Sequence, residues 1–399
     1  MNESSRKIRV MHVYKFLHDG GTERYIHTLI SGMDPSVYSF SICCLNERGS
    51  RAAAFEQEGF PVYALNVKRT RAFTAVANNL VQIFRLARLL RSLQIDIMHT
   101  HDNYSAAYAR LAALLARVPI VYVTYHCVYE WLKPVHHRIN QLMAMKTTRI
   151  FAVSSTVKIS SASKDRIPER KYSVIYNGAL FEPSADPEHL AGSRSQWGIP
   201  PDARIIGNVG MLSQLKGQGL LIEAIGQLAK EFPDVYLVII GSERDFEPQV
   251  KADLERIATD LGVLDRVVLA GSRDDVLSLL YGFELFVMPS RVEGFGLALV
   301  EAMCSGVPAI VSDIEAFKEL TQNGRHALLC KSGSSDELTK ALRYALSHRE
   351  EMLERAAISK AYAREKFTTE RMVLEYEKAY ARDLTERGFR HASWSQYRS

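Results

Sequence analysis

The sequence contains few cysteines, and they form no pattern that marks a disulfide framework or a zinc site. The five cysteines, Cys43, Cys44, Cys127, Cys304 and Cys330, are odd in number and include no C-x-x-C pair. Most of them lie within apolar stretches, where a thiol is usually buried and reduced. We therefore expect a protein of a reducing compartment, the cytoplasm.

Long apolar runs are also missing. A membrane-spanning helix needs roughly 18–20 apolar residues, and the longest candidate, residues 108–125, is interrupted by Arg110, Arg117 and Pro119. The first seven residues are polar and lead directly into an apolar segment, without the apolar core of a secretory signal. These features predict a cytoplasmic protein that is attached to the inner face of the plasma membrane at most peripherally.

Metal-binding patterns are equally scarce. The chain has no D-x-D sequence of the kind that holds Mg²⁺ or Mn²⁺ beside a diphosphate. His99 and His101 alternate as two ligands on one strand would, but the sequence shows no third ligand clustered with them. We therefore expect no metal ion and no other cofactor.

Positive and negative charges are unevenly distributed. Residues 1–178 carry 24 lysines and arginines against 12 acidic residues, and the remainder carries 26 against 33, so that +12 and −7 give the net charge of +5. A basic surface attracts anionic partners. The asymmetry fits either an ordinary solvated surface or contact with an anionic membrane or acceptor. Nucleic acid is disfavoured, because no nucleic-acid motif or aromatic-interleaved basic stripe is present.

One basic segment has the period of an amphipathic helix. Residues 81–93 carry arginines at i, i+3 and i+6, with apolar neighbours and further basic residues just before them: Arg85, Arg88, Arg91, Phe84, Leu89, Lys68, Arg69 and Arg71. Such a segment can lie at a plane of lipid headgroups. It can equally be a core-facing helix with basic outer positions, and both interpretations stay open.

Short β-branched segments alternate with helical-period segments along the whole chain, which is typical of parallel sheets built from βαβ units. The expected strands of the first half are residues 8–13, 40–45, 62–65, 95–99, 120–124, 150–153 and 173–176. Those of the second half are residues 205–209, 235–240, 267–270, 285–288, 309–311 and 327–329. The sequence therefore predicts an α/β protein with two doubly wound domains.

The boundary between these domains is predicted near Asn177-Gly178. Residues 182–202 contain four prolines, as expected of a linker. Residues 369–387 have the pattern of a helix that begins with a threonine cap. The predicted division is residues 1–178, residues 179–367, a terminal helix at 368–388 and a polar tail at 389–399.

The most informative segment is Glu293-Gly-Phe-Gly-Leu-Ala-Leu-Val-Glu301. Its glycines allow close approach of the backbone to a ligand, and the following helix N-terminus favours an anion. A second strand-to-helix turn, at residues 208–217, ends with Lys216. A third turn contains Asp19, Gly20 and Gly21. Together these turns predict a site that binds an anionic ligand with two ends.

Three such turns in this order resemble a family 4 glycosyltransferase of the GT-B fold, which has two facing Rossmann-like domains and a last helix that crosses back to the first. The resemblance covers essentially the whole chain. It implies retaining, metal-independent transfer of a sugar from a nucleotide diphosphate sugar, a UDP-sugar being the expected donor. The implied acceptor is a saccharide or a lipid-linked saccharide in the synthesis of cell-surface polysaccharide or glycolipid.

The resemblance also implies roles for particular residues. Glu301 would bind the ribose hydroxyls of the donor, and Lys216 would neutralise the leaving diphosphate. Glu293 and His126 would lie at the transferred sugar, which makes Lys216, Glu293 and His126 the expected catalytic residues. The remaining donor-binding residues would act largely through their backbone: Gly20, Gly21, Arg273, Gly294, Phe295, Gly296 and Leu297.

One position departs from the family pattern. Met211 stands where the family usually has an arginine, so the diphosphate site has one side-chain cation fewer, unless Arg273 or Arg291 lies near enough to compensate. Two alternative functions follow. The chain could bind a nucleotide sugar or a partner synthase without catalysis, or it could be a sugar-nucleotide epimerase, which would need acid and base carboxylates at C2 of the sugar.

Overall fold

The computed structural model describes residues 6–18, 20–68, 73–130, 132–181, 184, 186–243, 247–391 and 393–394, without the side chains of residues 73–75. Asp19, Arg69 and Arg71, which the sequence analysis singles out, and parts of the expected linker and tail lie outside the described residues. The chain forms two compact units. Unit 1 comprises Met1–Gly178 and Thr369–Ser399, and unit 2 comprises Ala179–Thr368.

Unit 1 contains a parallel sheet of seven strands in the order β3-β2-β1-β4-β5-β6-β7. The strands are β1 (Ile8–Tyr14), β2 (Tyr38–Cys44), β3 (Val62–Ala64), β4 (Ile97–Thr100), β5 (Ile120–Tyr125), β6 (Arg149–Ala152) and β7 (Tyr172–Val174). Because the strand order reverses direction at β1, right-handed crossovers place successive helices on opposite faces of the sheet. The predicted doubly wound architecture of the first half is confirmed.

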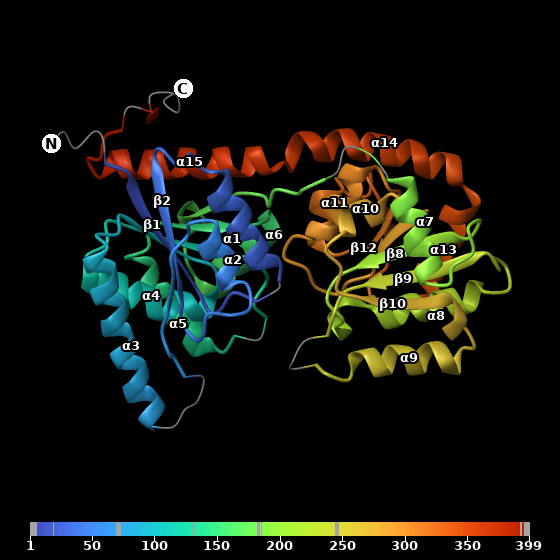
Figure 1. The fold of residues 1–399 in the computed structure, drawn as a ribbon, viewed down its shortest axis with the longest axis horizontal. Coiled ribbons are helices and arrows are strands. Elements are labelled where there is room, and N and C mark those ends of the chain that lie inside the picture. Colours follow the sequence, from blue (N-terminus) through green and yellow to red (C-terminus); the bar gives the residue numbers. More distant parts are fainter. Residues whose placement is uncertain are drawn as a thin grey trace. The chain divides into compact units, whose positions relative to one another are not determined.

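The two faces of this sheet are covered by different sets of helices (Figure 1). Residues of α1 (Gly21–Gly32), α2 (Ala52–Gln57) and α15 (Thr369–Glu386) share one apolar core with the sheet. Residues of α3 (Phe73–Ser92) and α4 (Asn103–Ala116) form a second core on the sheet. Further along, α5 (Pro134–Ala144) contacts α4, and α6 (Ser155–Asp165) contacts α5.

Helix α15 is held to unit 1 by a buried ion pair. Asp383 accepts hydrogen bonds from Arg149 at 2.8 and 3.1 Å and from the hydroxyl of Tyr122 at 3.0 Å. Burial alone would raise the pKa of Asp383, but the hydrogen bonds and charge of Arg149 outweigh it and bring that pKa below its ordinary value. Helix α15 therefore completes the core of unit 1, although it follows unit 2 in the sequence.

Unit 2 contains a parallel sheet of six strands in the order β10-β9-β8-β11-β12-β13. The strands are β8 (Arg204–Val209), β9 (Val235–Ile240), β10 (Val267–Gly271), β11 (Leu285–Met288), β12 (Ala309–Ser312) and β13 (Leu328–Cys330). This is a second doubly wound sheet, as predicted. The order reverses at β8, so that the loops after β8 and β11 meet where ligands usually bind in such sheets.

The helices of unit 2 complete its two outer layers. They are α7 (Pro187–Gln196), α8 (Gln218–Leu228), α9 (Val250–Asp260), α10 (Val276–Leu280), α11 (Leu297–Ser305), α12 (Glu315–Leu320), α13 (Ser335–Ser347) and α14 (Arg349–Lys366). Residues of α8, α9 and α13 share one core with the sheet. In the part of the chain that the structure describes, no helix is both long enough and apolar enough to cross a bilayer.

Candidate functional site

Lys216 and Glu293 come together in unit 2, although 77 positions separate them in the sequence. The Nζ atom of Lys216 lies 2.5 Å from Oε1 of Glu293, and the hydroxyl of Ser290 donates to the same oxygen at 2.9 Å. The side chains remain 21 and 10% exposed, so a ligand can still reach this pair. A carboxylate that balances the lysine can be exchanged for the negative charge of an incoming anion.

The loop that carries Lys216 is fixed by its own backbone. A short 3₁₀ turn, Gln214–Lys216, ends at Gly217 with φ of +71°, and an added Cβ there would lie 2.3 Å from the carbonyl oxygen of Pro289. The loop after β8 therefore packs directly on the loop after β11. A backbone hydrogen bond from Arg291 to Leu215 at 2.8 Å joins the same two loops.

The glycine turn before α11 offers a second feature suited to an anion. Gly296 caps the helix with φ of +102°, and an added Cβ would lie 2.7 Å from the ring of Phe317. No side chain caps this helix, so the turn contributes backbone N–H groups and the positive end of the helix dipole. Gly294 lies in this turn, and Leu297 is the first residue of the helix.

Phe295 and Glu301 lie inside the protein rather than on its surface. Phe295 is buried and packs edge-on against Phe367, with ring centroids 5.7 Å apart. Glu301 lies within α11 and is 4% exposed. A buried carboxylate is costly unless hydrogen-bond donors surround it. Its position one turn after the glycine turn fits recognition of hydroxyl groups on the same ligand.

The charge of Arg273 is balanced within its own turn. Its guanidinium is bound by Asp275 through two hydrogen bonds, at 2.8 and 2.5 Å, and it lies over the ring of Trp197. His189 contacts the same carboxylate at 2.8 Å. Arg273 would therefore have to leave Asp275 to replace the cation missing at Met211, just as Lys216 would have to leave Glu293 to meet an anion. Arg291 is exposed and adjoins the Lys216 loop, so it remains the candidate.

In unit 1, Gly20 and Gly21 form the entrance to α1. Gly20 is the N-cap in extended backbone, and an added Cβ would lie 2.6 Å from Oε2 of Glu23. Around Gly21 an added Cβ would meet no atom within 4 Å. The carboxyl of Glu23 therefore folds back over the turn, as a carboxyl at the third helical position commonly does.

Glu23 is a candidate functional residue that the sequence analysis missed. Its side chain is 5% exposed, and burial raises its pKa from 4.5 to about 7. A carboxyl with such a pKa can gain or lose a proton near neutral pH. The signal that could have found it is its place three residues after the N-cap of a helix that follows a strand.

His126 follows β5 and lies among other aromatic rings. Its Nε2 atom is 3.3 Å from Nδ1 of His101, and its ring packs edge-on against Tyr25 at 4.6 Å. Burial lowers the pKa of His126, which favours the neutral imidazole. His126 is therefore part of a hydrogen-bonded group, and its expected role at the transferred sugar stays a prediction.

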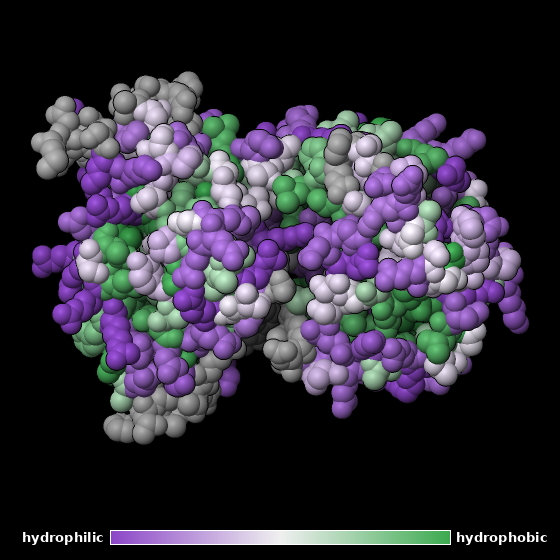
Figure 2. Space-filling view, viewed as in Figure 1, coloured by the Kyte–Doolittle hydropathy of each residue, from purple (hydrophilic) through white to green (hydrophobic). Residues whose placement is uncertain are grey.

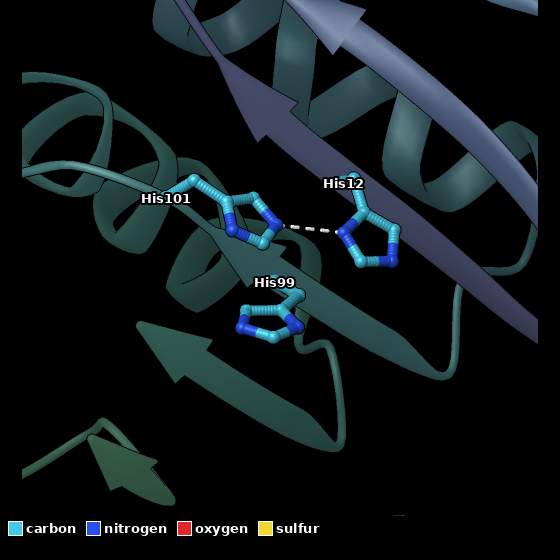
Figure 3. A group of neighbouring side chains, drawn as sticks. All are labelled: His12, His99 and His101. Atoms are coloured by element: carbon cyan, nitrogen blue, oxygen red, sulfur yellow. Dashed lines mark hydrogen bonds between the residues drawn. The ribbon is translucent and has the colours of Figure 1, made fainter. Parts of the chain in front are cut away.

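The expectation that His99 and His101 have no third histidine beside them is wrong. His12 on β1 lies opposite His99 on β4, and nitrogen atoms of His12, His99 and His101 all lie within 4.8 Å of one another (Figure 3). The parallel register of β1 and β4 joins residues 87 positions apart. Sequence spacing alone could not indicate this contact.

Comparison with known proteins identifies the family of the chain. Residues 191–365 match the family described as glycosyl transferases group 1, and residues 19–179 match glycosyltransferase family 4. The chain belongs to the family 4 glycosyltransferases. The two matched segments correspond to the two units of the fold, so both halves of this glycosyltransferase carry family sequence.

Individual relatives of this family 4 glycosyltransferase are distant. It is 28% identical over 286 residues to the Escherichia coli UDP-Gal:α-D-GlcNAc-diphosphoundecaprenol α-1,3-galactosyltransferase, covering 67% of this chain and 70% of that protein. It is 24% identical over 328 residues to the N-acetyl-α-D-glucosaminyl L-malate synthase of Bacillus anthracis, covering 80 and 83%.

Solved structures share the fold. HepE of Anabaena, in complex with UDP and glucose, has a TM-score of 0.83 and 20% sequence identity, over 94% of this chain and 99% of HepE. WaaG, a glycosyltransferase involved in lipopolysaccharide biosynthesis, has a TM-score of 0.64 and 16% identity, over 89 and 95%. These likenesses confirm the predicted GT-B fold.

Proposed function

We propose that this protein transfers a sugar from a UDP-sugar, with retention and without a metal ion, to a saccharide or lipid-linked acceptor of cell-surface polysaccharide or glycolipid biosynthesis. The observation that carries the proposal is the meeting of Lys216, Glu293 and the uncapped N-terminus of α11 in one part of unit 2. Anion binding at such a point suits a diphosphate. UDP is bound in the HepE structures, which have the same fold.

Each part of the donor would meet a group of matching chemistry. The hydroxyls of the ribose would bind the buried carboxylate of Glu301, and the base would contact the backbone beside Arg273. The diphosphate would face Lys216 and the backbone N–H groups at Gly296 and Leu297. Glu293, released from Lys216 as the diphosphate takes its place, would accept hydrogen bonds from hydroxyls of the transferred sugar.

The transfer step follows from this arrangement. The bond between the anomeric carbon and the diphosphate oxygen breaks while the acceptor oxygen bonds to that carbon from the same face. The acceptor's proton passes to the departing diphosphate oxygen, so no protein nucleophile is required. Lys216 and the N-terminus of α11 stabilise the charge that grows on the diphosphate. Holding the two substrates in place supplies much of the remaining rate enhancement.

The donor experiment is a thermal-shift screen of the purified full chain against UDP-, GDP-, ADP- and CMP-sugars without added metal. A ligand that binds only the folded protein raises its stability in proportion to RT ln(1 + [L]/Kd). We expect a shift with UDP-sugars that is lost in Glu301→Ala and kept in Glu350→Ala, a control on the exposed surface of α14. A thermal shift with another nucleotide class would show that the donor carries that nucleotide instead of UDP.

Catalysis needs a separate experiment, because a non-catalytic binder would give the same thermal shift. We expect the stabilising UDP-sugar to be consumed slowly by hydrolysis or transfer, with UDP released. Binding without either activity, on any acceptor, would favour the non-catalytic alternative that Met211 suggests. Conversion of the UDP-sugar alone to its epimer would favour an epimerase instead.

The surface of unit 1 supports an acceptor that lies in an anionic membrane. Large apolar side chains are exposed on α3, among them Leu80 at 54% and Phe84 at 63%, and on α5, where Leu142 is 63% exposed. Arg85 and Arg88 are exposed on α3 beside them. Hydrophobic and hydrophilic residues also mix on the surface of unit 1 in Figure 2. A surface of this composition can bind anionic lipid headgroups.

The membrane part of the proposal is tested by sedimentation with vesicles. We expect binding to anionic vesicles that weakens steeply as salt increases, and little binding to neutral vesicles. Phe84→Ser should weaken this binding, whereas Leu261→Ser should not, because Leu261, an apolar residue that is 44% exposed, belongs to unit 2. Equal effects of the two substitutions would contradict the assignment to unit 1.

A further inference from the structure

The buried histidines of unit 1 are joined by hydrogen bonds as well as by ring packing. His12, His99 and His101 are 0, 0 and 1% exposed, and each makes defined hydrogen bonds. Nδ1 of His12 lies 2.7 Å from Nε2 of His101, and Nδ1 of His101 lies 3.3 Å from Nε2 of His126. The rings of His12, His101 and His126 thus form one continuous hydrogen-bonded chain, which we call the histidine relay. It runs from the buried strand β1 to the partly exposed His126.

His99 belongs to a different set of hydrogen bonds. Its Nδ1 atom contacts the hydroxyl of Tyr380 at 2.6 Å, and its Nε2 atom contacts the hydroxyl of Thr124 at 2.7 Å. Both ring nitrogens of His99 are therefore engaged by hydroxyls. His12 and His101 are at hydrogen-bonding distance from each other (Figure 3). Five of the six ring nitrogens of His12, His99 and His101 therefore contact another imidazole or a hydroxyl, which is the geometry of hydrogen-bonded imidazoles and not that of ligands around a common metal ion.

A relay of neutral imidazoles can be oriented in only two ways. Burial lowers the pKa values of His12, His101 and His126, so each ring carries one N–H and one bare nitrogen. In one orientation every ring donates toward His126, and in the other every ring donates toward His12. The position of the hydrogen on the ring at either end of the relay therefore fixes the tautomer of all three rings.

The buried end of the relay decides between the two orientations. Nε2 of His12 is buried and has no hydrogen-bond partner among the described residues. A buried N–H group without an acceptor is rarer in proteins than a buried acceptor without a donor. A bare Nε2 on His12 puts its hydrogen on Nδ1, which then donates to His101. His101 in turn donates from Nδ1 to Nε2 of His126.

We propose that His12 and His101 are positioning residues that fix the tautomer of His126, so that its Nδ1 carries a hydrogen and serves as a donor. His126 is partly exposed, and its Nδ1 atom has no hydrogen-bond partner among the described residues, so this atom is the end of the relay that a ligand can meet. His126 then donates to an oxygen of a bound sugar and does not act as a base. This last consequence rests on the proposed function, whereas the tautomer itself does not.

The tautomer is measured directly by nitrogen NMR of the full chain labelled with ¹⁵N-histidine, because protonated and bare ring nitrogens have separate shifts. We expect Nδ1–H and bare Nε2 in His12, His101 and His126. In His12→Phe, which keeps a ring but removes the donor, His126 should populate both tautomers. In His12→Asn, whose amide nitrogen takes the place of Nδ1, the wild-type tautomer should return. His27→Phe, on the exposed side of α1, is the control.

Three results would overturn the proposal. Nε2–H on His126 in the wild-type protein would reverse the direction of the relay. An unchanged tautomer in His12→Phe would show that His12 does not control His126. Stoichiometric Zn²⁺ that shifts His12, His99 and His101 together would make the cluster a metal site.

Kinetics then separate this inference from the proposed function. In His12→Phe only a fraction of the protein keeps the donor tautomer of His126, so the KM for the donor sugar should rise by the inverse of that fraction, about twofold if the two tautomers are equally populated. We expect that rise in His12→Phe, with near wild-type KM in His12→Asn. If no nucleotide sugar binds at all, the proposed function fails while the tautomer result stands. A fall in kcat of equal size in both variants would indicate a merely structural role.

Discussion

The two units place their ionisable groups in different surroundings. In unit 2 the functional charges, Lys216 and Glu293, face each other at a partly exposed turn and can be exchanged for a ligand. In unit 1 the ionisable groups of the core are buried: Asp383 is paired with Arg149, Glu23 is protonated up to about neutral pH, and the rings of the histidine relay are neutral. The same strand-to-helix architecture therefore supports a charged site in one unit and an uncharged hydrogen-bonded one in the other.

The largest expected effect concerns the buried ion pair of unit 1. Asp383→Ala removes the carboxylate that pairs with Arg149 and the shorter hydrogen bond of the Tyr122 hydroxyl, which should cost about 3–5 kcal/mol of folding free energy. The matched change in unit 2 is Glu231→Ala, which removes the exposed pair with Arg343 and should cost at most about 1 kcal/mol. Denaturant unfolding of both variants measures the difference.

The pH dependence of this contribution has a definite sign. Because the pKa of Asp383 is below its ordinary 3.8, the stabilisation is fully present above that pH and is lost as the pH falls through the lower, folded-state pKa. When the pH is lowered from neutral, the free energy of unfolding of the wild-type protein should therefore fall by more than that of Asp383→Ala, which has no carboxyl to protonate at this position. Parallel acid curves would contradict the role given to Asp383.

The second prediction concerns the charged site of unit 2. Lys216→Ala removes the cation that balances Glu293 and, in the proposed function, the one that stabilises the leaving diphosphate. Removing one such group should lower kcat by about 10²–10³-fold. Release of UDP from the stabilising UDP-sugar measures the rate, and Lys251→Ala on the exposed face of α9 is the control. A rate within about twofold of the wild type would show that the diphosphate binds elsewhere.

The third prediction concerns the buried carboxyl of unit 1. Since the folded state holds the proton of Glu23 up to about pH 7 and the unfolded state only up to about 4.5, wild-type stability should fall as pH rises across that window. The full difference is about 3 kcal/mol. Glu23→Gln should lack this decline, whereas Glu370→Gln, exposed on α15, should keep it. Denaturant unfolding at several pH values distinguishes these outcomes.

Much of the fold was predictable because it depends on local patterns. Every predicted strand overlaps an observed one; β4, for example, was expected at residues 95–99 and is found at Ile97–Thr100. The run from Glu293 to Glu301 likewise contains its own signal, since a glycine turn and the helix after it are adjacent in sequence. The structure gives the positions of the predicted site residues, and their roles in binding and catalysis remain predictions.

What the sequence could not indicate depends on register and side-chain direction. His12 meets His99 only because β1 and β4 pair in one particular register. Arg273 was a candidate cation by position, but its neighbour two residues on, Asp275, takes up its charge. The pKa of Glu23 depends on how α1 is covered, which no local pattern records. Long-range packing decides the chemistry of all three.

The smallest expected effect is found when the glycine turn of unit 2, at Gly296, is compared with that of unit 1, at Gly21. Gly296 has φ of +102° and no room for a Cβ beside Phe317, so Gly296→Ala should destabilise unit 2 by about 1–3 kcal/mol and weaken the binding of a UDP-sugar. Gly21 begins a helix and has open space around it, so Gly21→Ala should change stability by less than about 1 kcal/mol, in the stabilising direction because alanine restricts the unfolded chain. Denaturant unfolding of the two variants tests the contrast. If Gly21→Ala were as destabilising as Gly296→Ala, the turn of unit 1 would be as tightly constrained as that of unit 2, and the freedom that sets the two turns apart would not exist.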